Sequence, residues 1–195
     1  MTAQTFVFFG QVGSGKGTQV KLLSEYLVNK GEKMPLYAGT GEEFRKLINS
    51  DNYAADQIKG LLQKGQLVPD VITNCIFTGL FVFYLKRGDH AITDGYPRTV
   101  GQSEVFEKLM NFYDRKDVKI IYIKVSKDEA LKRNKLRGRA DDTDEGLAKR
   151  FEEYENNVVP AMNYFAGKEG YIIYEINGEQ SVEDVHQEII SKLGF

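Results

Sequence analysis

The sequence is poor in the residues from which several kinds of site are built. It has one cysteine, Cys75, in 195 residues. A single cysteine excludes a disulfide framework and any multi-cysteine zinc site, and it fits a reducing compartment. No apolar run approaches the ~20 residues of a membrane-spanning helix. The two histidines, His90 and His186, belong to no nucleophilic or metal-binding pattern, so we expect both to be structural or surface residues.

The sequence has nearly equal numbers of basic and acidic residues. The formal net charge is −2, from 26 basic and 28 acidic residues, which indicates no surface for nucleic acid or for an anionic membrane. The first residues, Met1 to Gln4, carry no basic region and no signal core. We therefore expect a cytoplasmic protein, and because nothing in the sequence demands an oligomer, a monomer. The length suits a single α/β domain over residues 1–195.

Arginine is scarce beside lysine. The basic residues are 18 lysines and only 8 arginines. Lysine is therefore the ordinary surface cation of this chain, whereas arginine is suited to bidentate phosphate contacts. The positions of the few arginines are consequently informative, and they are Arg45, Arg87, Arg98, Arg115, Arg133, Arg137, Arg139 and Arg150.

A glycine-rich loop follows the first apolar run. Phe6 to Phe9 lead into Gly10-Gln11-Val12-Gly13-Ser14-Gly15-Lys16-Gly17-Thr18, after which apolar residues recur at helical spacing. A buried strand, such a loop and a helix form the Walker A arrangement. The glycines let N–H groups turn toward phosphate, the helix start adds its positive dipole end, and Lys16 adds a mobile charge. A βα turn that binds nothing is the alternative.

Strand and helix patterns alternate along the chain. We expect strands at 6–9, 34–37, 90–93, 118–125 and 171–176, and helices at 16–29, 42–48, 54–64, 67–86, 101–113, 126–136, 141–154 and 181–193. This alternation predicts an α/β fold with five parallel strands and helices on both faces, in which the order 2-3-1-4-5 would place the glycine loop centrally. Cys75 falls inside a long apolar helix, so we expect a small buried residue there.

Four further stretches resemble the nucleoside monophosphate kinases, and most closely the adenylate kinase family. They are Gly39-Thr40-Gly41-Glu42-Glu43-Phe44-Arg45, Gly65-Gln66-Leu67-Val68-Pro69-Asp70, Asp94-Gly95-Tyr96-Pro97-Arg98-Thr99, and Arg139-Ala140-Asp141-Asp142 with Arg150 beyond it. The glycine loop also resembles that family's G-x-P-G-x-G-K-G-T-Q, which explains why Gly17 stands where a hydroxyl residue usually follows the lysine. The matches run from residue 6 to 182 in family order.

The resemblance implies a fold and a reaction. A P-loop NTPase-type sheet would carry a helical insertion at about 39–68 that binds the nucleoside monophosphate, and a very short lid at about 137–142. The enzyme would transfer the γ-phosphoryl group of ATP reversibly to AMP, giving two ADP. The ligands would be ATP, AMP and ADP, with Mg²⁺ as cofactor, no zinc, no nucleic acid and no membrane.

The resemblance also assigns site residues. ATP would be bound by Gly10, Gly13, Ser14, Gly15, Lys16, Gly17, Thr18, Arg133, Arg137 and Gln180. AMP would be bound by Thr40, Gly41, Arg45, Gln66, Val68, Gly95, Arg98, Gln102, Arg139 and Arg150. The catalytic charges would be Lys16, Arg98, Arg133, Arg139 and Arg150, and Asp94 would orient water bound to magnesium. Six of the eight arginines stand at these positions, as expected for a reaction that mainly positions anions and neutralises their charge.

The chain departs from the family pattern in three places. Val12 replaces a proline of the loop, and Gly39 and Glu42 replace serine and aspartate of the AMP motif. In the lid, a single residue, Gly138, stands where relatives carry a longer segment between two arginines.

Two alternatives to an active AMP kinase remain open. One is a kinase for another nucleoside monophosphate, such as UMP or CMP, against which Thr40 and Gln102 argue. The other is a catalytically weakened nucleotide-binding module with a regulatory role. Retention of Lys16, Asp94 and the arginines argues against it, because such decay is expected to lose some of them.

Overall fold

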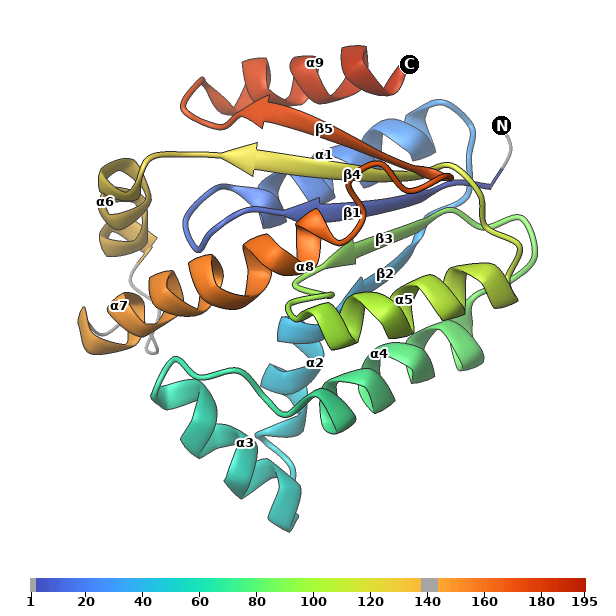
Figure 1. Cartoon of the computed structure of the whole chain (residues 1–195). Helices are drawn as coiled ribbons and strands as arrows, with labels where there is room; N and C mark the ends of the chain where they lie inside the picture. Colours follow the sequence, from blue (N-terminus) through green and yellow to red (C-terminus); the bar gives the residue numbers. More distant parts are fainter. Residues whose placement is uncertain (1–2, 138–143) are drawn as a thin grey trace.

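The strand order predicted from the sequence is confirmed. The computed structural model describes residues 3–137 and 144–195. Its five strands form one sheet in the order β2-β3-β1-β4-β5, and every pairing is parallel (Figure 1). They are β1 (Thr5–Phe9), β2 (Leu36–Gly39), β3 (Ala91–Asp94), β4 (Val118–Lys124) and β5 (Tyr171–Asn177).

The central strand β1 is buried along its whole length. Phe6 and Phe8 pack against α1 (Lys16–Asn29) and α9 (Val182–Leu193) on one face of the sheet. Val7 and Phe9 pack on the other face against α4 (Asp70–Tyr84), α5 (Val100–Phe112) and α8 (Val159–Asn163), as Figure 1 shows. Burial on both faces explains why this strand reads as an unbroken apolar run.

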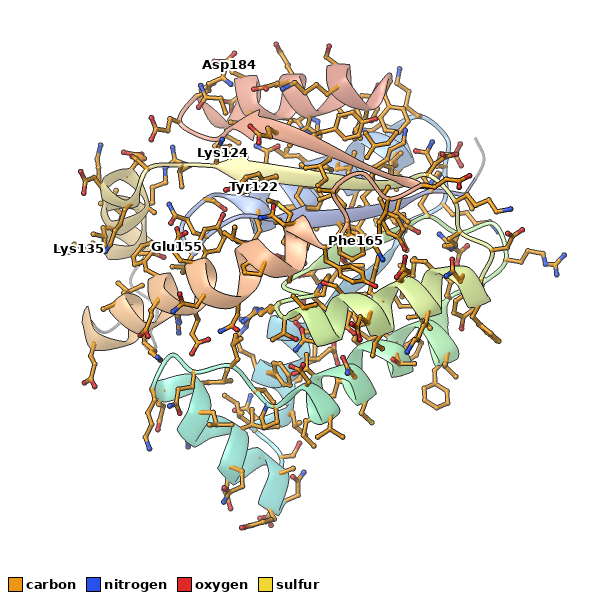
Figure 2. All side chains as sticks on the ribbon, in the orientation of Figure 1. Tyr122, Lys124, Lys135, Glu155, Phe165 and Asp184 are labelled. Carbon is orange, nitrogen blue, oxygen red and sulfur yellow. The ribbon has the colours of Figure 1, made fainter. Side chains whose placement is uncertain are left out.

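The second face is filled largely by aromatic rings. Phe77 of α4 and Phe106 of α5 are fully buried there. Phe165 lies between the sheet and α5 (Figure 2), with its ring edge-on to that of Phe106 at a centroid distance of 5.8 Å. This tightly packed layer supports the sheet and the loops that follow the carboxyl ends of its strands.

Two short helices project from the sheet beside the carboxyl end of β2. They are α2 (Thr40–Leu47) and α3 (Tyr53–Gln63), shown in cyan in Figure 1. Phe44, Ile58 and Val68 form a small apolar cluster of their own in this region. The segment is therefore packed locally rather than being part of either sheet-face core.

A continuous helical rod runs from the edge of the cleft back into the core. It consists of α7 (Asp144–Glu153), a π-helical turn η1 (Tyr154–Val158) and α8 (Figure 1). Opposite its outer end lies α6 (Lys127–Arg137). The sequence patterns predicted α7 but neither η1 nor α8. In the described parts of the chain, no helix is both long and apolar enough to cross a bilayer.

The expectation that Cys75 is buried is wrong. Its side chain is exposed, because the inner face of α4 is formed by Thr73, Phe77 and Phe81. The helix is apolar on nearly every side, and so periodicity could not identify the buried face. His90 does have a structural role, since it is buried and its Nδ1 accepts a hydrogen bond from the Gln4 backbone N–H at 3.1 Å.

The two faces of α4 predict very different effects for the same substitution. The Phe77 ring is buried and stacks on Tyr96 with centroids 3.7 Å apart. Phe77→Ala should lower the free energy of unfolding by about 3–5 kcal/mol through lost burial and a new cavity. Phe83 on the same helix is 78% exposed, so Phe83→Ala should change the free energy of unfolding by less than about 0.5 kcal/mol. Urea unfolding checks both, and equal effects would contradict the assigned faces.

Candidate functional site

A cleft of about 1000 Å³ lies at the carboxyl edge of the sheet. This is the edge at which open parallel sheets bind their ligands. The predicted site residues that line it are Gly10, Gly13, Ser14, Gly15, Lys16, Gly17, Thr18, Gly41, Arg45, Gln66, Asp94, Gly95, Arg98, Arg133, Arg150 and Gln180. Residues from the two halves of the chain thus meet around one space.

The glycine loop forms an anion site at one end of the cleft. It connects β1 to α1, and Gly13 and Gly15 adopt positive φ angles of 85° and 91°. Gly15 is the N-cap of α1 and has no side chain with which to cap the first N–H groups. Those groups and the helix dipole therefore favour an anion. The Lys16 ammonium donates to the carbonyls of Gly10 at 2.6 Å and Gln11 at 3.0 Å, which places its charge inside the loop.

Two contacts that the sequence did not predict hold this loop in place. Gln11 Nε2 donates to the carbonyls of Val125 at 2.7 Å and Ser126 at 3.2 Å, between β4 and α6. Gly13 lies so close to α6 that an added Cβ would lie 2.6 Å from both the Ala130 carbonyl oxygen and the Asn134 side chain. Residues more than a hundred positions away thus fix the loop, and no local motif signals them.

The predicted AMP residues come together around the turn after β3. Thr40 Oγ1 donates to the Gly95 carbonyl at 2.8 Å, and Arg98 Nε donates to the same oxygen at 2.7 Å. Thr40, Val68 and Gln102 do not line the large cleft, but they line an adjoining cavity of about 10 Å³ together with Arg98. The structure therefore brings together residues from three separate sequence motifs.

Asp70 organises this half of the site, although the sequence showed it only as part of a motif. Its carboxylate accepts hydrogen bonds from Gln102 Nε2 at 2.8 Å and from Thr99 Oγ1 at 2.7 Å. Gln102 Oε1 in turn accepts the Arg98 backbone N–H at 2.8 Å. Gln102 is only 1% exposed, so in this structure it supports the Arg98 backbone.

The positive side chains of the cleft repel one another. Burial lowers the pKa of the Arg98 guanidinium, and the neighbouring charges of Arg150 and Arg45 lower it further, while Asp94 opposes the shift. A cluster of cations lining a cleft is stabilised by an anion that enters it. The electrostatics therefore favour binding of phosphate between these arginines.

Arg133 and the segment after β5 line the cleft on the same side as the glycine loop. Arg133 donates to Glu129 Oε1 at 2.7 Å and to the Gly178 carbonyl at 2.9 Å. Gln180 Nε2 donates to Glu188 Oε2 at 2.7 Å. The Arg137 side chain, Arg139 and most of the predicted lid at about 137–142 lie outside the described residues.

The family was identified by comparison with known proteins. A family model described as adenylate kinase matches residues 8–170. The chain belongs to the adenylate kinase family. Its relatives include adenylate kinase of Corynebacterium aurimucosum, 33% identical over 190 residues that cover 97% of this chain and 98% of the relative. Adenylate kinase of Mycobacterium ulcerans is 36% identical over 162 residues, which cover 82% and 84%. The predicted family is confirmed.

The donors in the cleft fit the Mg²⁺ that the family resemblance implies. Asp94 ends β3 directly beside β1, where it is paired with Phe8, one residue before the strand leads into the glycine loop. Its half-buried carboxylate lines the same cleft as Lys16. Mg²⁺ typically takes one or two carboxylates and completes its shell with water and phosphate oxygens. A single carboxylate beside a phosphate loop suits that chemistry.

The sequence motifs did not identify several residues that line the cleft. Tyr37, Asn134 and Tyr154 line it, and none belongs to the recognised motifs. Tyr37 was expected only to end a strand at 34–37, whereas β2 begins at Leu36 and continues to Gly39. The one signal available for Tyr37 was the unusual glycine two residues later.

The packing of the loop predicts opposite effects for two glycines. Gly13 has φ +85° and touches the Ala130 backbone, so Gly13→Ala should lower the free energy of unfolding by about 1–3 kcal/mol. Gly17 lies in α1 with open space around it, so Gly17→Ala should leave that free energy unchanged or raise it by up to about 1 kcal/mol. Urea unfolding in the absence of nucleotide measures both. A Gly13→Ala protein as stable as the parent would show that α6 does not restrain the loop.

Proposed function

We propose that the chain catalyses reversible transfer of the γ-phosphoryl group of ATP to AMP, giving two ADP. The observation that carries the proposal is that one cleft holds two kinds of phosphate site. The glycine loop with Lys16 lies at one end, and Arg45 and Arg98 lie at the other, with Arg150 also on the wall. Membership of the adenylate kinase family supports the same reaction.

In the donor half, the glycine loop and the start of α1 bind the ATP phosphates. The Lys16 ammonium, already inside the loop, turns from its carbonyl partners toward the outer phosphates. Arg133 and the segment containing Gln180 lie where they can cover the base. Asp94 would hold water of the Mg²⁺ that accompanies ATP, and the ion would neutralise charge on the donor phosphates.

In the acceptor half, Arg45 and Arg98 bind the AMP phosphate. An oxygen of that phosphate attacks the γ-phosphorus, and the bond between this phosphorus and the oxygen bridging to the β-phosphate breaks. The leaving electrons stay on the β-phosphate of ADP. The attacking oxygen is already anionic, so no side chain has to remove a proton, and the protein contributes positioning and positive charge.

The finer assignments belong to the same proposal. The segment at about 39–68 is the AMP-binding insertion of a single kinase domain, and the segment at about 137–142 is assigned as its minimal lid, with Arg137 and Arg139 as phosphate-binding residues. The enzyme acts as a monomer in the cytoplasm, and its partners are the nucleotides.

A panel of acceptors tests the reaction. The protein is incubated with ATP and Mg²⁺ and with AMP, UMP, CMP or GMP in turn, and the diphosphate formed is measured. Fastest turnover with AMP is expected. Preference for UMP or CMP would indicate a kinase of the other specificity, and binding without transfer would indicate a regulatory module.

The role of Lys16 can be tested separately. Lys16→Met should lower kcat by ~100-fold or more, because it removes a cation from the phosphates being transferred. Lys116 is exposed, and its ammonium lies 3.2 Å from the carboxylate of the exposed Asp114, so Lys116→Met is a matched control that should retain the parent rate. A Lys16→Met enzyme with a near-normal rate would refute the assigned role.

A further inference from the structure

The AMP-binding motif of this chain contains a glycine where the family pattern has serine, and the structure gives a reason. A Cβ added to Gly39 would overlap the phenol ring of Tyr37, with Cε1 of that ring 2.6 Å away and the hydroxyl end nearer still. The Gly39 backbone itself is ordinary and extended, with φ −99°. The glycine is therefore needed for space rather than for backbone freedom.

The strand register directs the phenol toward a specific neighbour. Tyr37 and Gly39 are two residues apart on β2 and so share one face of the sheet. Gly39 is paired with Asp94 on β3, and Asp94 is paired with Phe8 on β1. A ring that lies along β2 over Gly39 therefore carries its hydroxyl to the end of β3, beside Asp94.

The charges around the hydroxyl agree with this placement. Burial raises the pKa of the Tyr37 phenol, and the nearby carboxylates of Asp94 and Glu42 raise it further, while Arg45 opposes them. A tyrosine hydroxyl carries one proton, which it can donate to a carboxylate next to it. Tyr37 also lines the cleft itself.

We propose that Tyr37 is a positioning residue whose hydroxyl donates a hydrogen bond to the Asp94 carboxylate, and that Gly39 is the residue that admits the phenol. The inference rests on the function proposed above, in which Asp94 holds water of the magnesium ion. A carboxylate has several orientations available when it is half-exposed. A donor on one oxygen leaves the other directed into the cleft, so less conformational freedom is lost when the metal–nucleotide complex binds.

The test compares nucleotide binding with and without metal in the folded, full-length protein. Calorimetry gives the Kd of a non-hydrolysable ATP analogue in Mg²⁺ and in EDTA, and their ratio measures how much the metal improves binding. Tyr37→Phe should lower that ratio by roughly fivefold, the scale of one hydrogen bond. The Kd in EDTA should stay within about twofold of the parent value, because the phosphate loop is untouched. Tyr53→Phe, at a 79% exposed tyrosine of α3, is the matched control and should change neither value.

Gly39→Ala removes the Tyr37 hydroxyl from Asp94 in an independent way. The Tyr37 side chain is 37% exposed, so the ring can rotate into solvent when a methyl group occupies its place. Gly39→Ala should therefore lower the ratio of the two Kd values, in EDTA and in Mg²⁺, to the same extent as Tyr37→Phe. In an Asp94→Asn background, Tyr37→Phe should have no further effect, because its partner is gone.

The outcomes separate this inference from the proposed function. Two results would overturn the role of Tyr37 even if the enzyme transfers phosphate normally. One is an unchanged ratio of the two Kd values in Tyr37→Phe. The other is an equal effect of Tyr37→Phe on that ratio in the Asp94→Asn background. A protein in which the ratio falls as expected but which forms no diphosphate from AMP would uphold Tyr37 and refute the proposed reaction.

Discussion

Like charges must be gathered in one small space before two nucleotides can react, and the structure is arranged around that constraint. Arg45, Arg98 and Arg150 line a single cleft with Lys16, and burial together with mutual repulsion lowers the pKa of Arg98. Such a cluster persists without phosphate only if the surrounding chain restrains it. The Gly95 carbonyl and the Asp94 carboxylate provide part of the compensation.

The restraint comes from buried polar contacts between distant segments. Asp70 of α4 fastens the turn after β3 through Thr99 and Gln102, and Gln102 holds the Arg98 backbone. At the other end, Gln11 ties the glycine loop to the region between β4 and α6. Each half of the cleft is thus fixed to the core by side chains that need not touch a nucleotide. Positioning of this kind is what phosphoryl transfer mainly requires of a protein.

The sequence predicted the parts of this protein that are encoded locally. Alternating patterns were sufficient for five parallel strands, and the motifs were sufficient to bring Lys16, Asp94 and Arg98 into one cleft. It failed where the decisive contact is remote or where a pattern is ambiguous. Nothing near Gly13 signals the approach of Asn134, and the nearly uniform apolarity of α4 concealed the exposure of Cys75. The unusual Gly39 was visible in the sequence, but the reason for it is the Tyr37 ring that lies along the same strand over Gly39.

The π-helical turn η1 has a consequence for how such a cleft can change during evolution. One rod carries Arg150 at its outer part and the buried Ala161 and Met162 at its inner part. Each residue of an α-helix advances the direction of the side chains by about 100°. A single-residue deletion within Tyr154–Val158 could therefore leave the core contacts and every recognisable motif intact while turning Arg150 out of the cleft. The length of this short segment thus determines whether Arg150 faces the cleft.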